Sequence, residues 1–197
     1  DAQRLDLFLA RRMEGFPMDD VPEVLEGMTP REAGGDLGMR YRYDAPWGTL
    51  RATALHDVTG ASGGGELRLG YSHTWRGERW VLRPDVTVSF RSADLNNYYY
   101  GVEPGEATPE RPAYAPGSGT DFTVGLYGTH DFLQNWRLIG GVAVTAHDSV
   151  VRDSPIIRDD RFNPALFVGT VYDFGTPIAR WDDENVPTLL KVFYGRA

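Results

Sequence analysis

The residues of this sequence best suited to chemistry are four histidines and two short motifs that combine serine with aspartate. His56, His73, His130 and His147 lie far apart along the chain, and no two of them have the spacing of a metal-binding motif. An isolated histidine more often makes a structural hydrogen bond than holds a metal or transfers a proton. We therefore expect no metal site and no catalytic site built on these histidines.

The two serine motifs are "HDS" at residues 147–149 and "DSP" at residues 153–155, and they contain the residue types of a Ser-His-Asp hydrolase. A catalytic triad is assembled from distant segments, so adjacency in the sequence does not support one. The G-x-S-x-G turn of many serine hydrolases is also missing. A barrel enzyme that hydrolyses lipid or lipopolysaccharide stays an alternative, but we expect no catalytic residue.

Two further motifs could bind ions. "TGASGGG" (residues 59–65) lacks the GK[ST] ending of a phosphate loop and precedes an alternating segment, so we expect a flexible loop. The acidic stretches "DDRF" (159–162) and "WDDENV" (181–186) are better explained as solvated loop charge than as a cation site. The sequence therefore predicts no bound cofactor and no bound metal.

Composition narrows the class of protein. A net charge of −8 with a single lysine predicts no nucleic-acid partner, because a nucleic-acid-binding surface needs clustered basic residues. The absence of cysteine excludes a disulfide scaffold and a thiolate metal site. The many glycines, prolines and aromatic residues (23 Gly, 13 Pro, 5 Trp, 10 Tyr and 9 Phe) favour an all-β chain.

The main structural signal is a period of two residues. In "ELRLGYSHTW", Leu67, Leu69 and Tyr71 alternate with Glu66 and Arg68, and the pattern recurs in at least four other segments. These are "LGMRYRYDA", "WVLRPDVTVSF", "DFTVGLYGTHDF" and "NWRLIGGVAVTAH". Strict alternation predicts strands with one apolar and one polar face.

Such strands occur in soluble β-sandwiches, for example carbohydrate-binding ones, and in membrane barrels with an apolar outside. The lengths of the connections decide between these two folds, because long connections alternate with short turns along the chain. The long stretches are residues 15–35, 59–65, 101–119 and 148–164, and the short turns are "APWG", "RGER" and "LQN". Outer-membrane barrels sort their connections in this way, with short turns in the periplasm and long loops outside. We therefore predict an antiparallel up-and-down transmembrane β-barrel.

This fold assigns roles to two sets of side chains. Aromatic residues at strand ends are expected at the membrane interfaces, where an apolar ring and a polar tip are both satisfied. They are Trp75, Trp80, Tyr98, Tyr99, Tyr100, Trp136 and Phe174, and the strand starting near residue 79 is expected to end at the three tyrosines. Polar residues on the opposite face are expected to line the lumen: Arg68, Arg83, Asp85 and Arg91.

The motifs "YYYGV", "PAYAPGSG", "NWRL", "DSPII" and "VYDF" follow one another over about residues 36–174. In this order they resemble the MipA/OmpV family of outer-membrane proteins, named after the MltA-interacting protein. The resemblance implies an outer-membrane barrel of a Gram-negative bacterium, in contact with outer-membrane lipid. It also implies a scaffolding role in murein synthesis, with a lytic transglycosylase and a bifunctional penicillin-binding protein as partners, and no enzymatic activity.

The chain departs from the family pattern in two places. Family members begin with strands that precede the segment matching "LDLFLARRMEGFP", and they end at the aromatic residue matching Phe174. We therefore expect residues 1–175 to form a barrel unit that lacks its first strands. Residues 176–197 are expected to form a periplasmic linker and the start of a further strand or second domain. The chain is accordingly interpreted as a segment of a larger barrel or of a two-barrel fusion.

Overall fold

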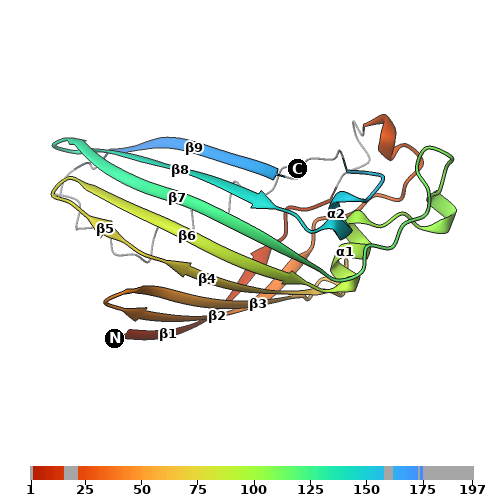
Figure 1. Cartoon of the computed structure of the whole chain (residues 1–197), viewed down its shortest axis with the longest axis horizontal. Helices are drawn as coiled ribbons and strands as arrows, with labels where there is room; N and C mark the ends of the chain where they lie inside the picture. The colour runs from red at the N-terminus through yellow and green to blue at the C-terminus, as the bar shows by residue number, and fades with distance from the viewer. Residues whose placement is uncertain (1, 16–21, 158–161, 173, 175–197) are drawn as a thin grey trace.

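The computed structural model describes residues 2–15, 22–157, 162–172 and 174. They form one antiparallel sheet of nine strands in the order β1-β2-β3-β4-β6-β7-β8-β9, with the short β5 paired to β6 (Figure 1). The strands are β1 Ala2–Arg11, β2 Gly35–Ala45, β3 Gly48–Asp57, β4 Gly65–Ser72, β5 Trp75–Arg76, β6 Trp80–Arg91, β7 Gly119–Leu133, β8 Trp136–Ala146 and β9 Phe162–Tyr172. The predicted all-β, antiparallel fold is confirmed, as a barrel-like sheet that is open between β1 and β9.

The two ends of the sheet differ, as the connection lengths predicted. Tight turns join β2 to β3, where Ala45 pairs with Gly48, and β7 to β8, where Leu133 pairs with Trp136. The long connections lie at the opposite end (Figure 1), and their described parts carry four short helices. These are η1 Glu23–Leu25, α1 Ala93–Tyr100, η2 Pro104–Glu106 and α2 Ser149–Arg152.

None of the helices in the described part of the chain is long and apolar enough to cross a membrane.

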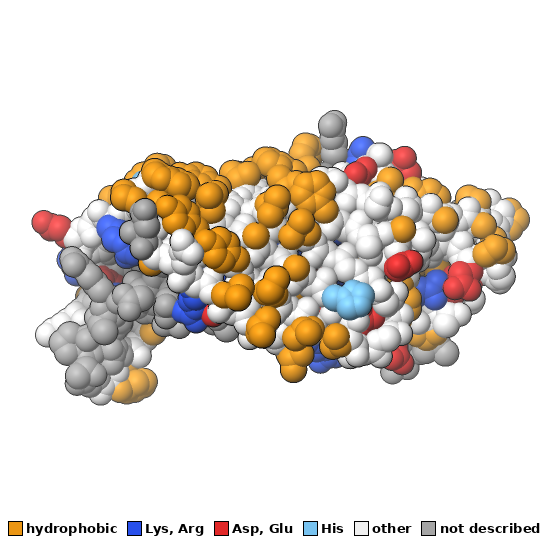
Figure 2. Space-filling view, turned by 90° about the horizontal axis from the view of Figure 1, so that it is seen from below, with side chains coloured by type: hydrophobic (Ala, Val, Ile, Leu, Met, Phe, Trp, Pro, Cys, Tyr) orange, Lys and Arg blue, Asp and Glu red, His pale blue; other side chains and the backbone are white. Residues whose placement is uncertain are grey.

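The two faces of the sheet are sorted by polarity. Tyr71, Val86 and Val124 are cross-strand neighbours on β4, β6 and β7, and their side chains are 40%, 38% and 48% exposed. Asp85, one residue from Val86, points to the other face and is only 9% exposed. Figure 2 shows hydrophobic side chains gathered over one face of the molecule. The alternating residues of each strand therefore put apolar side chains on the outer face and charged side chains on the inner face. A soluble sandwich has the opposite arrangement, with its apolar face inside.

One glycine is required by the turn between β2 and β3. Gly48 has a φ of 144°, and a Cβ there would lie 2.6 Å from the Tyr71 ring and 2.7 Å from the Ser72 carbonyl oxygen. Any side chain at this position would force the turn away from β4. The tight turn therefore depends on this residue.

The strand starting near residue 79 ends earlier than expected. β6 ends at Arg91, and Ser92 starts α1 by accepting a hydrogen bond from the Leu95 amide with its side chain. Asp94 in the first turn suits the positive end of the helix. The prediction of a strand that ends at Tyr98 was wrong, because this cap starts a helix six residues before it.

The glycine-rich connection between β3 and β4 is held by one aspartate. The Asp57 carboxylate accepts hydrogen bonds from the backbone amides of Thr59, Ser62 and Gly63 at 2.6–2.9 Å. A single carboxylate therefore organises this turn, and the expected flexibility of the loop stays a prediction. The second unit predicted at residues 176–197 lies outside the described residues.

Candidate functional site: an ion-pair cluster under the loop cap

Charged side chains gather where the inner face of the sheet meets the long connections. Arg12, just after β1, contacts Glu66 at 3.0 Å, Asp36 at 2.8 Å and Glu14 at 3.1 Å. The side chains of Arg12, Asp36 and Glu66 are at most 4% exposed. One guanidinium therefore joins the ends of β2 and β4 to the first long connection. We call this group, together with Arg91 and Tyr100, the loop-end cluster.

Glu14 is the second centre of the loop-end cluster. Its carboxylate accepts hydrogen bonds from Arg91 at 2.5 and 3.1 Å and from the Tyr100 hydroxyl at 3.3 Å. Burial by itself raises the pKa of the Glu14 carboxyl, but the Arg91 and Arg12 guanidinium groups outweigh burial and hold this pKa below its usual value. Glu14 is therefore ionised at neutral pH and ties β6 to the connection after β1.

The three tyrosines of α1 hold this helix against the first long connection. Tyr99 is 4% exposed, and its hydroxyl accepts from the Gly34 amide at 3.2 Å, while the Tyr98 hydroxyl accepts from the Glu32 amide at 2.9 Å. Burial, followed by the charge of Glu14, raises the pKa of the Tyr100 hydroxyl. These three side chains therefore project from a helix and form hydrogen bonds with residues 14–34. They do not form an aromatic belt at the end of a strand. Buried Tyr99 in particular does not suit the interfacial position expected for it.

A second group of charges links the two longest connections. Glu106, 8% exposed, binds Arg31 at 2.7 Å and accepts from the backbone amides of Thr29 at 2.9 Å and Glu103 at 3.1 Å. Burial raises the pKa of the Glu106 carboxyl, but these hydrogen bonds lower it to about 2. Residues 75 positions apart in sequence, Arg31 and Glu106, are thereby fixed to each other.

Arg111 extends this link through its guanidinium. It donates to the carbonyl oxygens of Val24 at 2.6 Å, Glu26 at 3.1 Å and Glu106 at 2.7 Å, and it is 5% exposed. The described parts of residues 12–34, 92–118 and 147–157 thus form one interlocked unit, which we call the loop cap. Ser154, on the third of these connections, joins it by donating to the Tyr100 carbonyl oxygen at 2.6 Å.

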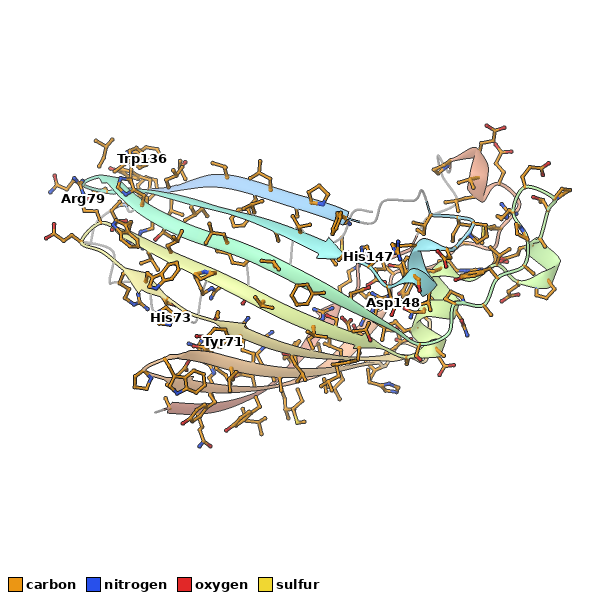
Figure 3. The ribbon with its side chains drawn as sticks, viewed as in Figure 1. Tyr71, His73, Arg79, Trp136, His147 and Asp148 are labelled. Atoms are coloured by element: carbon orange, nitrogen blue, oxygen red, sulfur yellow. The ribbon has the colours of Figure 1, made fainter. Side chains whose placement is uncertain are left out.

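The "HDS" motif lies at the edge of the loop cap, where Figure 3 labels His147 and Asp148 beside α2. Asp148 caps this helix, accepting from the amides of Thr120 at 2.8 Å and Val150 at 3.3 Å. The Ser149 hydroxyl donates to the same carboxylate at 3.1 Å, while His147 Nδ1 lies 3.2 Å from Asp121. Serine and histidine thus contact different carboxylates, which is a packing arrangement and not a proton relay.

The four residues predicted to line a lumen all lie on the polar face. Nε and Nη2 of Arg68 donate to the two carboxylate oxygens of Glu66 at 2.6 and 2.8 Å, and Asp85 pairs with Arg51. The Arg83 guanidinium lies 5.6 Å from the centre of the Tyr127 ring, and Arg91 belongs to the loop-end cluster. Because the sheet is open, the statement that this face borders a lumen stays a prediction.

The other predicted aromatic residues lie toward the turn end of the sheet. Trp75, Trp80, Trp136 and Phe174 are 49%, 46%, 39% and 91% exposed. Trp136 contacts Tyr172 at 4.9 Å between ring centres, and Tyr172 contacts Phe174 at 4.7 Å. Their expected position at a membrane interface stays a prediction.

A second aromatic group at this end was missed by the sequence analysis. The Trp47 carbonyl oxygen, in the β2–β3 turn, accepts from the Tyr71 hydroxyl at 2.7 Å and from His73 Nδ1 at 2.9 Å. Because a carbonyl only accepts, Nδ1 of His73 carries a proton. The Trp47 and Tyr71 rings stack at 6.1 Å, and Figure 3 labels Tyr71 and His73 in this group. The tryptophan inside the turn "APWG" was the signal that could have identified it.

Within the part of the chain that the structure describes, no three His, Asp or Glu side chains are placed to hold a metal ion.

The sheet has apolar side chains outside and ion pairs inside, with tight turns at one end and the loop cap at the other. This is the architecture of an outer-membrane β-barrel protein. The profile of the family described as "MltA-interacting protein MipA" matches residues 1–174. The chain belongs to this family, as the motif resemblance predicted.

Individual relatives agree with the family. The chain is 30% identical to the outer membrane protein Omp26La of Vibrio anguillarum over 158 residues, which are 80% of this chain and 61% of the relative. It is 29% identical to OmpV of Vibrio cholerae over 171 residues (87% and 65%) and 26% identical to the MltA-interacting protein of Escherichia coli over 157 residues (79% and 63%). The predicted location in the outer membrane of a Gram-negative bacterium is confirmed by these relatives.

The aligned chain spans less than two thirds of the length of these relatives. No solved structure matches the chain.

Proposed function

We propose that this chain is part of a structural outer-membrane barrel that acts as a scaffold in the cell envelope. The observation that carries the proposal is the loop cap, in which a buried ion pair and hydrogen bonds join the described parts of three long connections into one interlocked unit. Such a cap stiffens the barrel end and leaves the outer aliphatic side chains of the sheet to contact lipid. In this arrangement the loop cap faces outside the cell, and the tight turns and exposed tryptophans face the periplasm.

The scaffold is proposed to serve murein synthesis. One relative is named the MltA-interacting protein, which supports the lytic transglycosylase MltA as a partner. A penicillin-binding protein is proposed as a second partner on the motif resemblance alone. The tight turns offer little area compared with the roughly 800 Å² per partner of a standard interface. We therefore assign most of this protein–protein contact to parts of the full-length protein outside these turns.

We propose further that the described residues do not form an enzyme. The relatives are named as outer-membrane or interacting proteins. The Ser149 hydroxyl donates to Asp148, whereas His147 lies beside a different carboxylate, Asp121, so these residues do not have the arrangement that the hydrolase alternative requires.

The direct test is isolation of the full-length protein from its own bacterium. We expect extraction from outer membranes only with detergent, and co-isolation of a lytic transglycosylase identified by mass spectrometry. The control is a second outer-membrane barrel carrying the same tag. Release without detergent would refute the membrane placement, and retention of the transglycosylase by both barrels would refute the scaffold role.

A further inference from the structure

The geometry points to an oxyanion-binding site on the inner face of the sheet, where Arg40, Arg51 and Arg68 surround Thr53. We call these three arginines the arginine triad. The ligand is a small dissolved solute that carries a carboxylate or a phosphate group. This inference goes beyond the proposed scaffold role, and it rests only on the prediction that the inner face borders a lumen.

The register of three neighbouring strands brings the arginine triad together. Arg40 on β2 pairs with Thr53 on β3, and Thr53 pairs with Arg68 on β4, so these three residues form one row on the same face. Arg51 lies two residues before Thr53 on β3 and therefore points to this face as well. Directly opposed residues have Cβ atoms about 4.5–5.5 Å apart, so three long arginine side chains can reach one bound ion.

Arg40 is the member of the triad that has no carboxylate of its own. Its guanidinium lies 4.9 Å from the centre of the Phe8 ring, and within the described part of the chain it makes no hydrogen bond or ion pair. Asp6, its cross-strand partner on β1, is bonded to Arg4 at 2.7 Å instead. Because Arg40 is half-buried, its unpaired charge costs free energy that a bound anion would recover. All five N–H donors of this guanidinium are available for such a ligand.

The other two arginines add positive charge beside Arg40. Arg68 donates to Glu66 through Nε and Nη2, and its Nη1 has no partner among the described residues. Arg51 pairs with Asp85, and the charges of Arg51 and Arg68 both repel that of Arg40. Like charges at facing positions destabilise a sheet. An anion bound between Arg40 and Arg68 would replace this repulsion with attraction.

The shape of the guanidinium groups selects the class of anion. A planar guanidinium presents parallel N–H donors that match the two oxygens of a carboxylate or phosphate, whereas a halide ion cannot accept from the fork in this way. The site also lies on the face opposite to Met39 and Tyr41, the outward neighbours of Arg40, which are 49% and 42% exposed. We therefore assign the ligand to a dissolved solute and not to a lipid headgroup.

The test is equilibrium dialysis of the full-length protein in a nonionic detergent, with no phospholipid present. One arm uses radiolabelled inorganic phosphate and the other radiolabelled acetate, both at constant ionic strength in sodium chloride. Arg40→Gln removes the charge, and Arg40→Lys keeps the charge but not the fork. The matched control is Arg79→Gln, which removes an exposed arginine from the turn before β6. Urea unfolding of each protein in chloride alone is measured alongside.

We expect saturable binding of at least one of the two anions by the unmodified protein and by the Arg79→Gln variant. Arg40→Gln should weaken this binding by about 10- to 100-fold, the effect of losing a hydrogen bond between charged groups, and Arg40→Lys should weaken it less. In chloride alone, Arg40→Gln should unfold at the same urea concentration as the unmodified protein or at a higher one, because it removes an unpaired charge.

Three results would overturn the proposal. They are no saturable binding of either anion by the unmodified protein, equal binding by the Arg40→Gln variant, and an equal loss of binding in the Arg79→Gln control. A lower urea midpoint of Arg40→Gln in chloride would likewise assign Arg40 a structural role and contradict the site. Detergent extraction and co-isolation test the scaffold role separately, so the failure of one proposal does not decide the other.

Discussion

A single charge on the outer face of β6 tests whether that face contacts lipid. Val86 lies near the middle of the 12-residue strand and is 38% exposed between Tyr71 and Val124. An arginine on the lipid side of a barrel costs roughly 2–4 kcal/mol at the bilayer midplane. At tenfold per 1.4 kcal/mol, Val86→Arg is expected to lower the folding equilibrium constant by about 30- to 700-fold.

Thr87→Arg is the matched control, one residue away at nearly the same depth. Thr87 points to the polar face, where its hydroxyl donates to Asp85 at 3.1 Å. Its cross-strand partner on β4 is Gly70, against which the Arg51 guanidinium lies while it pairs with Asp85. The new guanidinium enters a polar setting where it can share the Asp85 carboxylate, so the expected loss is about 1 kcal/mol, smaller than for Val86→Arg.

The assay is urea unfolding of the full-length protein folded into phosphatidylcholine vesicles, followed by tryptophan fluorescence. The difference between the two variants is the informative quantity, since both introduce the same side chain. Equal loss of stability, or a larger loss for Thr87→Arg, would refute the assignment of the outer face to lipid.

Three other predictions concern the loop cap, the inner face and the "HDS" motif. The pKa of Glu106 is lowered from 4.5 to about 2, so its ion pair with Arg31 stabilises the loop cap fully above pH 4.5 and is lost as the pH falls toward 2. Limited proteolysis of the loops between about pH 2 and 6 should therefore become faster as the pH falls. The Glu106→Gln variant should lack this dependence on pH. Gly141→Ala should destabilise the protein by about 1–3 kcal/mol, because the new Cβ would lie 2.3 Å from the Tyr127 ring. The control is Gly169→Ala, whose Cβ meets only ordinary contacts at 3.4 Å or more. Equal urea midpoints for the two variants would contradict this prediction. Ser149→Ala should leave any lipid hydrolysis by the full-length protein unchanged in an esterase assay.

The strands and their faces were predictable from the sequence because they depend on local order alone. Successive residues of a strand point to opposite faces, so the alternation around Leu67 and Arg68 fixed both faces of β4. The short turns were equally local. The same reasoning failed after Arg91, where one capping serine outweighed the β-forming tyrosines that follow.

The loop cap could not be predicted, because its contacts join residues that are distant in sequence. Glu14 and Arg91 are 77 positions apart, and Arg31 and Glu106 are 75 apart. No periodicity links such residues, and their charges look like ordinary loop charges when each connection is considered alone. The folded sheet must first bring the connections to one end before these side chains can be recognised as partners.

Cysteine labelling in living cells tests the central claim most directly, because the 197 residues contain no cysteine. Glu110 lies in the loop cap and Glu78 in a tight turn, and both are exposed. A membrane-impermeant maleimide added to intact cells that express the full-length protein should label Glu110→Cys. It should label Glu78→Cys only after the outer membrane is permeabilised. Labelling of residue 78 but not of residue 110 in intact cells would contradict the proposed outer-membrane topology.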